Sequence, residues 1–409
     1  MPPSTRACGW TAPASALPVA DVKIERALPW ALIGAACLGS FAATSSGTTR
    51  APFLIDIGRD LEVSMPLVAN LVSVTATAWG VTSALGGWLS DRVGRRILLV
   101  AAPLALAGVM VMQALSASFA SLAAWATLSG ACAGAFMGVI FAEVSVHVED
   151  RQRGRALGWV MSGQSLTLVI GVPLAALIGS MIGWRGWLVC VGGLSAAASL
   201  SLYLTVKPTV QAPAGTPRTT MRGALSPRVL GLLGTGIAER ICYGLAAVYY
   251  ATFLQVTYGL SLVALALPLA VFAIGNVLGT ILGGQLADKL RERLITFAVF
   301  MVASGAAALV LFWWHPDPET SVALGFIYVL LNALGRPSLM ASYAEVPESV
   351  RGTVMGLSGA SASVGWVGAA GLGALIIGAG GFDGFGPLAA ALALLGALGA
   401  LWCRQASVT

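Results

Sequence analysis

Long apolar stretches alternate with short polar connections along most of this chain. From Leu28 onward, twelve stretches are each long enough to cross a bilayer, which takes about 20 helical residues. They cover residues 28–53, 66–90, 97–117, 120–144, 156–182, 185–205, 229–256, 261–287, 294–315, 320–343, 353–380 and 385–403. The pattern predicts an all-α membrane protein with twelve transmembrane helices.

The longest polar connection divides these stretches into six and six. It covers residues 206–228 and is rich in Pro, Thr and Ala. We therefore expect an N-terminal six-helix bundle over 28–205 and a C-terminal one over 229–403. A central cytoplasmic loop over 206–228 would join them, with cytoplasmic tails over 1–27 and 404–409.

Composition and charge exclude several classes of protein. Hydrophobic residues make up 57% of the 409 residues and charged residues 10%, whereas soluble domains carry about 25% charged residues. The main partner is therefore the lipid bilayer. The basic residues lie in short loops and not on one face, so we expect no nucleic-acid partner. Eighteen of the 23 Lys and Arg residues fall on one side of the predicted topology and two in the opposite loops. This asymmetry predicts a multi-pass protein of the inner cell membrane with both termini in the cytoplasm.

The two halves of the chain repeat one another. Asp91 closes the second stretch and Asp288 the eighth, 197 residues apart, and Arg153 and Arg351 lie 198 residues apart in Arg-Gly pairs. Two markers at nearly one offset indicate a duplicated six-helix unit. The two bundles should therefore be pseudo-symmetric, with the solute pathway between them.

A glycine- and arginine-rich loop follows the second stretch. It reads Gly87-x-Leu89-Ser90-Asp91-Arg92-x-Gly94-Arg95-Arg96, in which glycines permit a tight turn and arginines hold the loop in the cytoplasm. The loop resembles the signature motif of the major facilitator superfamily. That resemblance implies a secondary transporter that works by alternating access.

The same resemblance implies a cytoplasmic gate. Glu143 would pair with Arg92 or Arg95, and Glu345 with Arg291 or Arg293; substrate contact is the alternative role for these acids. The gating residues expected in this way are Gly87, Asp91, Arg92, Gly94, Arg95, Arg96, Glu143, Asp288, Arg291 and Glu345.

A second motif lies in the fifth stretch. It consists of Gly163, Gly171, Pro173 and Gly179. It is similar to the helix-5 motif of the drug and sugar (arabinose-efflux-like) antiporters, and generic packing of small residues is the alternative. Those antiporters usually carry an arginine four residues before a glycine in the fourth span. Here that position is Ala126, so proton antiport does not follow from the resemblance.

Charged residues within the apolar stretches are the candidates for substrate binding. A charge at mid-membrane is costly, so it usually faces a cavity or a partner and has a function. Tyr243 and Tyr250 follow Glu239 at helical spacing and could hold a partly aromatic solute, although packing is the alternative. The predicted substrate-binding residues are Arg50, Glu239, Arg240, Tyr243, Tyr250 and Arg336. Three arginines exceed one carboxylate, so the sequence favours an anionic substrate, unless the arginines serve as structural ion pairs.

The predicted function is therefore efflux antiport of a small, anionic organic solute by a monomer. Protons are one candidate coupling ion, with Glu239 as the carboxylate that would carry them. Proton-coupled or facilitated uptake of an organic anion is the alternative, and a transporter-like sensor is a more distant one. The sequence contains no phosphate-binding loop, no Cys/His metal cluster and no recognisable catalytic set, so we expect neither an enzyme nor a cofactor or metal site.

Overall fold

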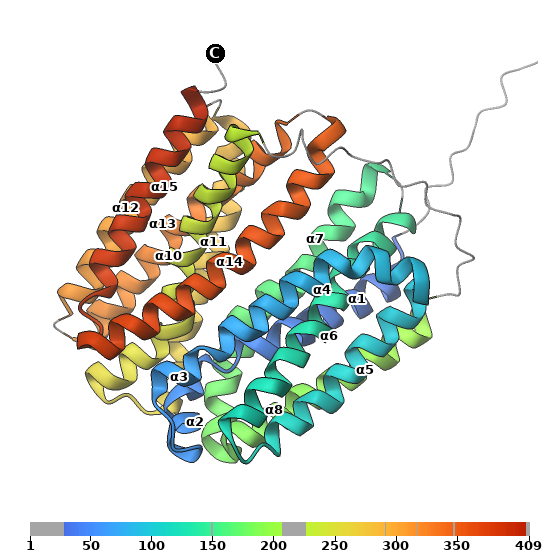
Figure 1. Cartoon of the computed structure of the whole chain (residues 1–409), viewed down its shortest axis with the longest axis horizontal. Helices are drawn as coiled ribbons and strands as arrows, with labels where there is room; N and C mark the ends of the chain where they lie inside the picture. Colours follow the sequence, from blue (N-terminus) through green and yellow to red (C-terminus); the bar gives the residue numbers. More distant parts are fainter. Residues whose placement is uncertain are drawn as a thin grey trace, which may run out of the picture.

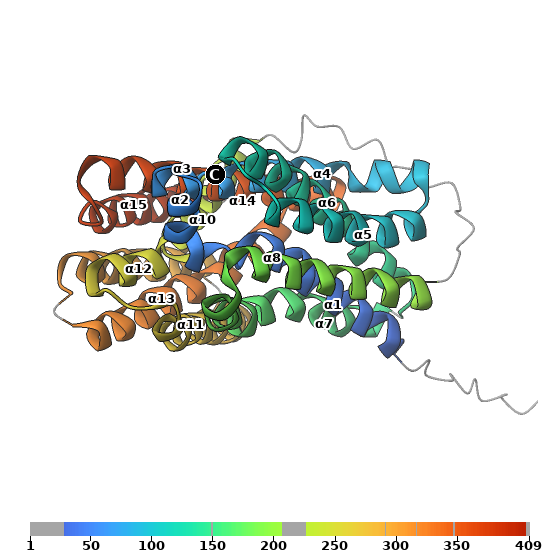
Figure 2. The ribbon, with the colours of Figure 1, turned by 90° about the horizontal axis from the view of Figure 1, so that it is seen from below.

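The computed structural model describes residues 28–148, 150–206, 226–290, 292–315, 317–346 and 348–405, and those residues form helices and short connections with no strand. The predicted N-terminal tail and most of the predicted central loop and C-terminal tail lie outside these ranges. The helices form two groups that stand side by side, the first drawn blue to green and the second yellow-green to red (Figures 1 and 2).

The N-terminal group contains ten helical segments. They are α1 (Trp30–Thr48), the 3-10 turn η1 (Ala51–Phe53), α2 (Leu54–Asp60), α3 (Met65–Ala69), α4 (Leu71–Val93), α5 (Arg95–Ala114), α6 (Phe119–Val146), α7 (Asp150–Leu166), the π-helical turn η2 (Thr167–Gly171) and α8 (Val172–Thr205).

The C-terminal group contains six helices. They are α10 (Pro227–Tyr258), α11 (Leu262–Lys289), α12 (Arg293–Trp313), α13 (Pro318–Ala344), α14 (Glu348–Gly380) and α15 (Phe385–Gln405).

Ten helices in the described ranges are long and apolar enough to cross a membrane. One of them covers 54 residues, Gln152–Thr205, and is interrupted at Gly183, where φ is +74°. This helix contains both the fifth and the sixth predicted stretch, while α1 is not among the ten. The all-helical membrane fold is thus confirmed, and the number twelve stays a prediction.

Polar residues at the helix starts explain several boundaries. In each case the side chain accepts a hydrogen bond from the backbone N–H three residues later, which satisfies one of the free donors of the first turn. These N-caps are Ser118 of α6, Ser226 of α10, Ser261 of α11 and Asp317 of α13. At α13, hydrogen bonds from the backbone N–H and the hydroxyl of Thr320 hold the pKa of Asp317 below its usual range.

Proline residues accompany two departures from regular α-helix in the predicted spans. The first stretch was expected to continue to residue 53, but α1 ends at Thr48 and the chain turns through η1, which contains Pro52. Proline has no N–H to donate and disfavours helix before it. In the fifth stretch the π-helical turn η2 comes directly before Val172 and Pro173. The fifth stretch therefore departs from regular α-helix at Thr167–Gly171.

Glycines let helices of the N-terminal group touch backbone to backbone. A Cβ on Gly130 of α6 would lie 2.2 Å from the carbonyl oxygen of Thr75 on α4, and one on Gly134 would lie 2.4 Å from that of Trp79. Gly138 meets Ser83 in the same way. The α4–α6 contact is thus a small-residue interface of the kind that drives helix association in lipid.

We expect Gly130→Ala to destabilise the protein. The added methyl group would meet backbone atoms, which cannot rotate away, so α4 and α6 must separate; overpacking of this kind costs about 1–3 kcal/mol. The measurement is the apparent unfolding midpoint of the purified protein. Gly108→Ala on α5 is the matched control, because nothing lies within 4 Å of its added Cβ. Equal midpoints for the two variants would contradict the close approach.

The two groups touch each other away from the basic loops. We name the end of the molecule that carries Arg92, Arg95, Arg96, Lys289, Arg293 and Arg404 the basic end. Ser73 of α4 donates a hydrogen bond to the Val367 carbonyl of α14 at 3.4 Å, and Gly80 faces Ser363. Further contacts join α3 to α14, η1 to α10 and α8 to α11. Ser73 and Val367 each lie in the half of their helix that is farther from the basic end.

Candidate functional site

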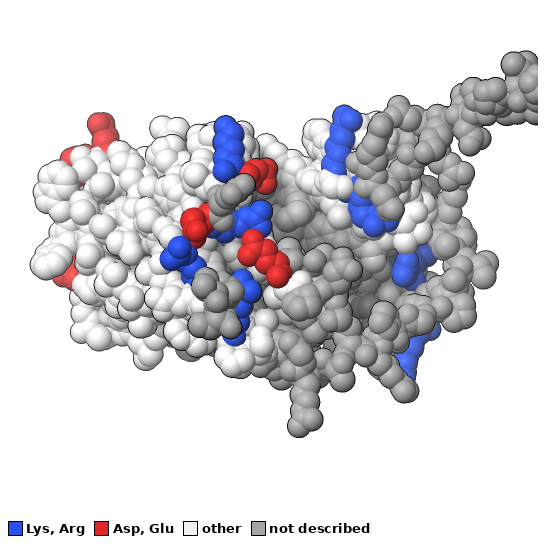
Figure 3. Space-filling model, turned by 90° about the horizontal axis from the view of Figure 1, so that it is seen from above, with Lys and Arg blue, Asp and Glu red and all other residues white. Residues whose placement is uncertain are grey.

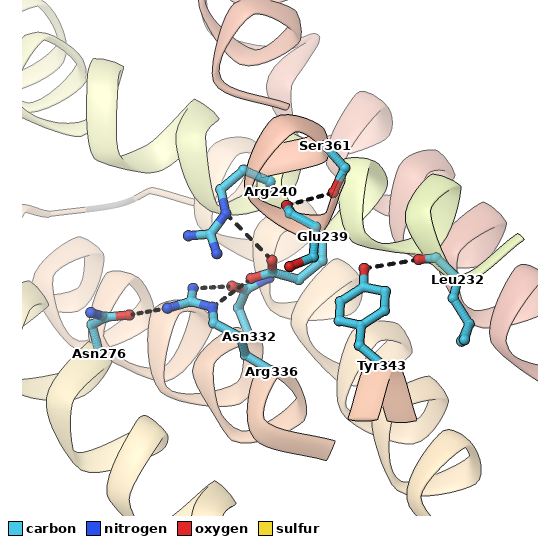
Figure 4. A network of polar contacts seen from close by, with 9 residues as sticks. Leu232, Glu239, Arg240, Asn276, Asn332, Arg336, Tyr343 and Ser361 are labelled. Carbon is cyan, nitrogen blue, oxygen red and sulfur yellow. Dashed lines mark hydrogen bonds and ion pairs between the residues drawn. The ribbon is translucent and has the colours of Figure 1, made fainter. Parts of the chain in front are cut away.

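A buried carboxylate and two arginines meet inside the C-terminal group. Glu239 lies near the middle of the 32-residue α10 and is almost fully buried. Its Oε1 accepts a hydrogen bond from Nε of Arg336, from α13, at 2.9 Å, and its Oε2 lies 3.7 Å from Nε of the neighbouring Arg240. We call these three residues the central cluster; Figure 4 shows them.

Arg336 has a full set of partners. Besides the bond to Glu239, its Nη1 donates to the amide oxygen of Asn276 on α11 at 3.4 Å, and its Nη2 to that of Asn332 at 3.3 Å. All three nitrogen atoms of the guanidinium are therefore engaged by groups of this chain (Figure 4). Arg336 thus joins three helices of the C-terminal group.

Arg240 is held more loosely. Its Nε makes no hydrogen bond, and the terminal nitrogens point away from the carboxylate of Glu239 (Figure 4). The side chain is 15% exposed. Because one carboxylate faces two guanidinium groups, the central cluster carries a net charge of +1, and Arg240 is the member with unused donors.

Tyr243 connects the cluster to a small cavity. The guanidinium of Arg336 lies 4.7 Å from the centre of its ring and that of Arg240 5.7 Å away, both within the range of cation–π attraction. Trp366 of α14 packs edge-on against the same ring. Tyr243 therefore has charge on one side and aromatic surface on the other.

Tyr250 takes a different role from Tyr243. Its hydroxyl donates to the Ser321 carbonyl at 3.1 Å, and its ring stacks against Phe253 and Phe272. The hydroxyl is thus committed to the protein, so only the ring of Tyr250 faces the cavity described next.

The cavity lies between the two groups and is small in this state. Its volume is about 30 Å³, room for no more than a few water molecules. Thr48, Ala51, Leu168 and Val172 line it from the N-terminal group; Tyr243, Ala246, Ala247, Tyr250, Leu269, Phe272 and Ala273 line it from the C-terminal group. A drug-sized solute needs several hundred Å³, so this cavity must widen to admit one.

Arg50 lies apart from the central cluster, within the N-terminal group. Its Nη2 donates to the hydroxyl of Thr75 on α4 at 3.0 Å, while its Nη1 is buried without a hydrogen-bond partner. The residue is only 4% exposed. The expected meeting of three arginines at one substrate is not seen in this state; the structure brings together two of them.

The expected gate residues lie at the basic end, and only part of their pairing is observed. Arg293 donates to Glu345 at 2.7 Å, as predicted, and Arg228 lies 3.9 Å from the same carboxylate. The alternative partner Arg291 lies outside the described residues. Asp288 is exposed at the end of α11. Over the C-terminal group, acidic and basic side chains alternate on this face, whereas those described over the N-terminal group are basic (Figure 3).

On the N-terminal side, Glu143 is buried and lies 3.6 Å from Nδ1 of His147, one turn later on α6. The predicted pairing with Arg92 or Arg95 is not observed between these described side chains in this state. Arg96 instead donates to the Tyr203 carbonyl of α8 at 3.2 Å.

The glycines of the signature loop behave as expected where they are described. Gly94 has φ of +97° and ends α4 directly before α5, which only glycine adopts without strain. Gly87 and Asp91 lie within α4, and the Asp91 side chain is outside what the structure describes.

The helix-5 motif lies against α1 and η1. A Cβ on Gly163 would meet the Cys37 carbonyl at 2.3 Å, and one on Gly179 would meet the Phe53 ring at 2.2 Å. At Gly171 the nearest atoms are 3.4 Å away, an ordinary contact. Two of the three glycines are therefore required for close packing, and Pro173 follows the π-helical turn.

Several contributors to the site were not assigned by the sequence. Thr75 and Trp366 carry no distinguishing pattern within their apolar stretches. Asn276 and Asn332 are recognisable as polar residues in mid-span, but their shared partner Arg336 follows only from the fold.

A bundle of apolar helices around a buried, charged cluster is the architecture of a membrane transporter. The chain belongs to the major facilitator superfamily, whose family model matches residues 36–305 and 232–408. It is 28% identical over 328 residues to a chloramphenicol resistance protein of Streptomyces lividans, covering 76% of this chain and 84% of that protein. It is 26% identical to a probable sugar efflux transporter of Helicobacter pylori, over 67% of this chain and 70% of that protein.

The fold has a counterpart among solved structures. A bacterial homolog of the human lysosomal transporter Spinster, in an inward-facing and occupied conformation, superposes with a TM-score of 0.73 at 17% identity. The match covers 93% of this chain and 97% of that one. The family and these relatives are membrane transporters and not enzymes.

Proposed function

We propose that this protein exports a small, negatively charged organic solute across the inner membrane, by antiport and alternating access. Twelve spans in two six-helix bundles, with both termini in the cytoplasm, form the topology of this proposal. The named efflux functions of the S. lividans and H. pylori relatives favour export.

The observation that carries the anionic substrate is the free side of Arg240. Its terminal nitrogens point away from Glu239 (Figure 4), and the cluster keeps one uncompensated positive charge. A planar guanidinium can bind a carboxylate or phosphate through two parallel hydrogen bonds. A negative group on the solute would neutralise the cluster, and the ring of Tyr243 would lie beside it.

The contacts between the two groups support alternating access. They lie at mid-height or toward the end away from the basic loops, and the cavity beside Tyr243 is closed to about 30 Å³. In this proposal the conformation described here is closed at the end away from the basic loops, and the solute enters from the basic end. Binding would shift the balance of states only as far as the solute binds one state more tightly than the other.

A ligand screen tests the substrate class. Purified protein is heated with organic anions, organic cations and neutral compounds, including chloramphenicol, at matched concentrations. We expect organic anions to raise the apparent unfolding midpoint, because a ligand of the folded state stabilises it by mass action. A cation that stabilises strongly while no anion does so would contradict the proposal.

The direction is tested with the best ligand in membrane vesicles. Antiport with protons predicts accumulation in everted vesicles when their interior is made acidic. Accumulation in right-side-out vesicles when the outside is made acidic would instead support proton-coupled uptake, which the surplus positive charge of the cluster would serve equally well.

A further inference from the structure

Arg50 is a buried cation without a negatively charged partner in the described structure. It follows Thr49, the C-cap of α1, and directly precedes η1, and its guanidinium is buried against Thr75 of α4. The acidic side chains of α2 have other partners: Asp56 lies 3.9 Å from Arg59, and Asp60 binds Arg185 at 2.6 Å. A guanidinium buried at 4% exposure with no counter-charge is energetically costly.

The surroundings hold the guanidinium in one position. Thr75 Oγ1 accepts from Arg50 Nη2, and its own proton lies within reach of the carbonyl oxygens of Leu71 at 2.7 Å and Ala126 at 3.3 Å. Gly130, one turn after Ala126, lets the α4 backbone lie directly against α6 at this level. The guanidinium is therefore held at Nη2 by Thr75, whose own position is fixed against α6, while Nη1 has no hydrogen-bond partner among the described residues.

Space remains beside this charge because residue 47 is glycine. A Cβ built on Gly47 would find only Thr75 Cγ2, at 3.7 Å, and Arg50 Nη2, at 3.9 Å, within 4 Å outside its own helix neighbours. Thr44 lies one turn earlier on the same side of α1, and its buried hydroxyl also makes no hydrogen bond among the described residues. Arg50 Nη1 and the Thr44 hydroxyl are thus two buried polar atoms without a hydrogen-bond partner among the described residues, and Gly47 lies between these two residues in the sequence.

We propose that Arg50, Gly47 and Thr44 form a binding site for a compact monovalent anion in the N-terminal group, separate from the central cluster. The guanidinium supplies the charge and the free N–H groups, Thr44 supplies a hydroxyl, and Gly47 leaves the room. Either an inorganic ion such as chloride or the carboxylate of a small organic acid has this chemistry. The site does not depend on the transported solute, so its test needs no substrate.

The test compares anions at constant ionic strength. Purified protein is heated in potassium chloride or potassium acetate, each titrated into morpholinoethanesulfonate, an anion too bulky for a position beside one missing methyl group. We expect a saturable rise of the apparent unfolding midpoint with the compact anion. A response to chloride identifies an inorganic ion as occupant; a response to acetate alone identifies a carboxylate.

Two substitutions test whether the anion-dependent rise of the unfolding midpoint arises at this site. Gly47→Ala fills the space with a methyl group at ordinary contact distance, so the helix should fold normally but lose the anion-dependent rise. Gly34→Ala, on the same helix with nothing within 4 Å, is the matched control and should keep it. Arg50→Gln should also lose the rise. If wild-type protein shows no saturable response, or Gly47→Ala and Arg50→Gln both retain it, the site does not exist.

Discussion

Glu239→Gln is expected to abolish transport and to destabilise the protein strongly. The substitution keeps an oxygen that can accept the hydrogen bond from Arg336, but it removes the only negative charge between two guanidinium groups. Both arginines are about 15% exposed or less, so water compensates little. Removing one partner of a buried ion pair costs about 3–5 kcal/mol. The measurements are the apparent unfolding midpoint and solute flux in proteoliposomes.

A second substitution separates charge from packing. In Glu239→Gln with Arg240→Gln, the cluster returns to a net charge of +1, as in the wild type. We expect this double variant to recover much of the lost stability but not transport. Glu319→Gln, at an exposed position in the first turn of α13, is the control for losing one carboxylate. If Glu239→Gln unfolds at the same temperature as this control, the negative charge of Glu239 does not stabilise the two arginines, and the prediction is wrong.

The sequence predicts the all-helical membrane fold well because the length of an apolar stretch acts locally. Each span follows from about 20 apolar residues, and family membership follows from the loop around Gly94, where a positive φ makes glycine necessary. The irregularities were harder to place. Pro52 and Pro173 mark both of them, yet whether a proline ends a helix or adds a π-helical turn depends on neighbouring helices.

The candidate site was predicted in composition but not in arrangement. Glu239, Arg240 and Arg336 are conspicuous because charge in lipid is costly, and the structure brings them together. Arg50 is equally conspicuous, but which face of its turn it occupies depends on η1, so its position against Thr75 could not be read from spacing. Arg336, and not Arg240, has all its guanidinium nitrogens hydrogen-bonded, because Asn276 and Asn332 accept from it. Such pairing between helices cannot be read from a single sequence.

Arg336→Gln should mainly lower stability, whereas Arg240→Gln should mainly weaken solute binding. From the sequence both arginines are candidates to contact the solute directly, but their hydrogen bonds divide the roles. Removing Arg336 leaves Glu239, Asn276 and Asn332 without their common donor in a buried place. Each unsatisfied buried group costs about 1–3 kcal/mol, so this variant should unfold at a markedly lower temperature.

Arg240→Gln should instead stay nearly as stable as the wild type and lose the solute. Its guanidinium makes no hydrogen bond through Nε, so little is broken in the protein, and Glu239 keeps Arg336 as its partner. A desolvated charge pair with an anionic solute is worth about 2–5 kcal/mol, and each 1.4 kcal/mol is tenfold, so affinity should fall roughly 30-fold to more than 1,000-fold. Arg240→Lys should restore part of it, because an ammonium keeps the charge without the planar fork.

Binding is measured by calorimetry, with Arg59→Gln on the exposed turn of α2 as the control. A lipophilic cation that binds wild type and Arg240→Gln equally tightly, while anions bind neither, would show that both arginines serve the structure alone.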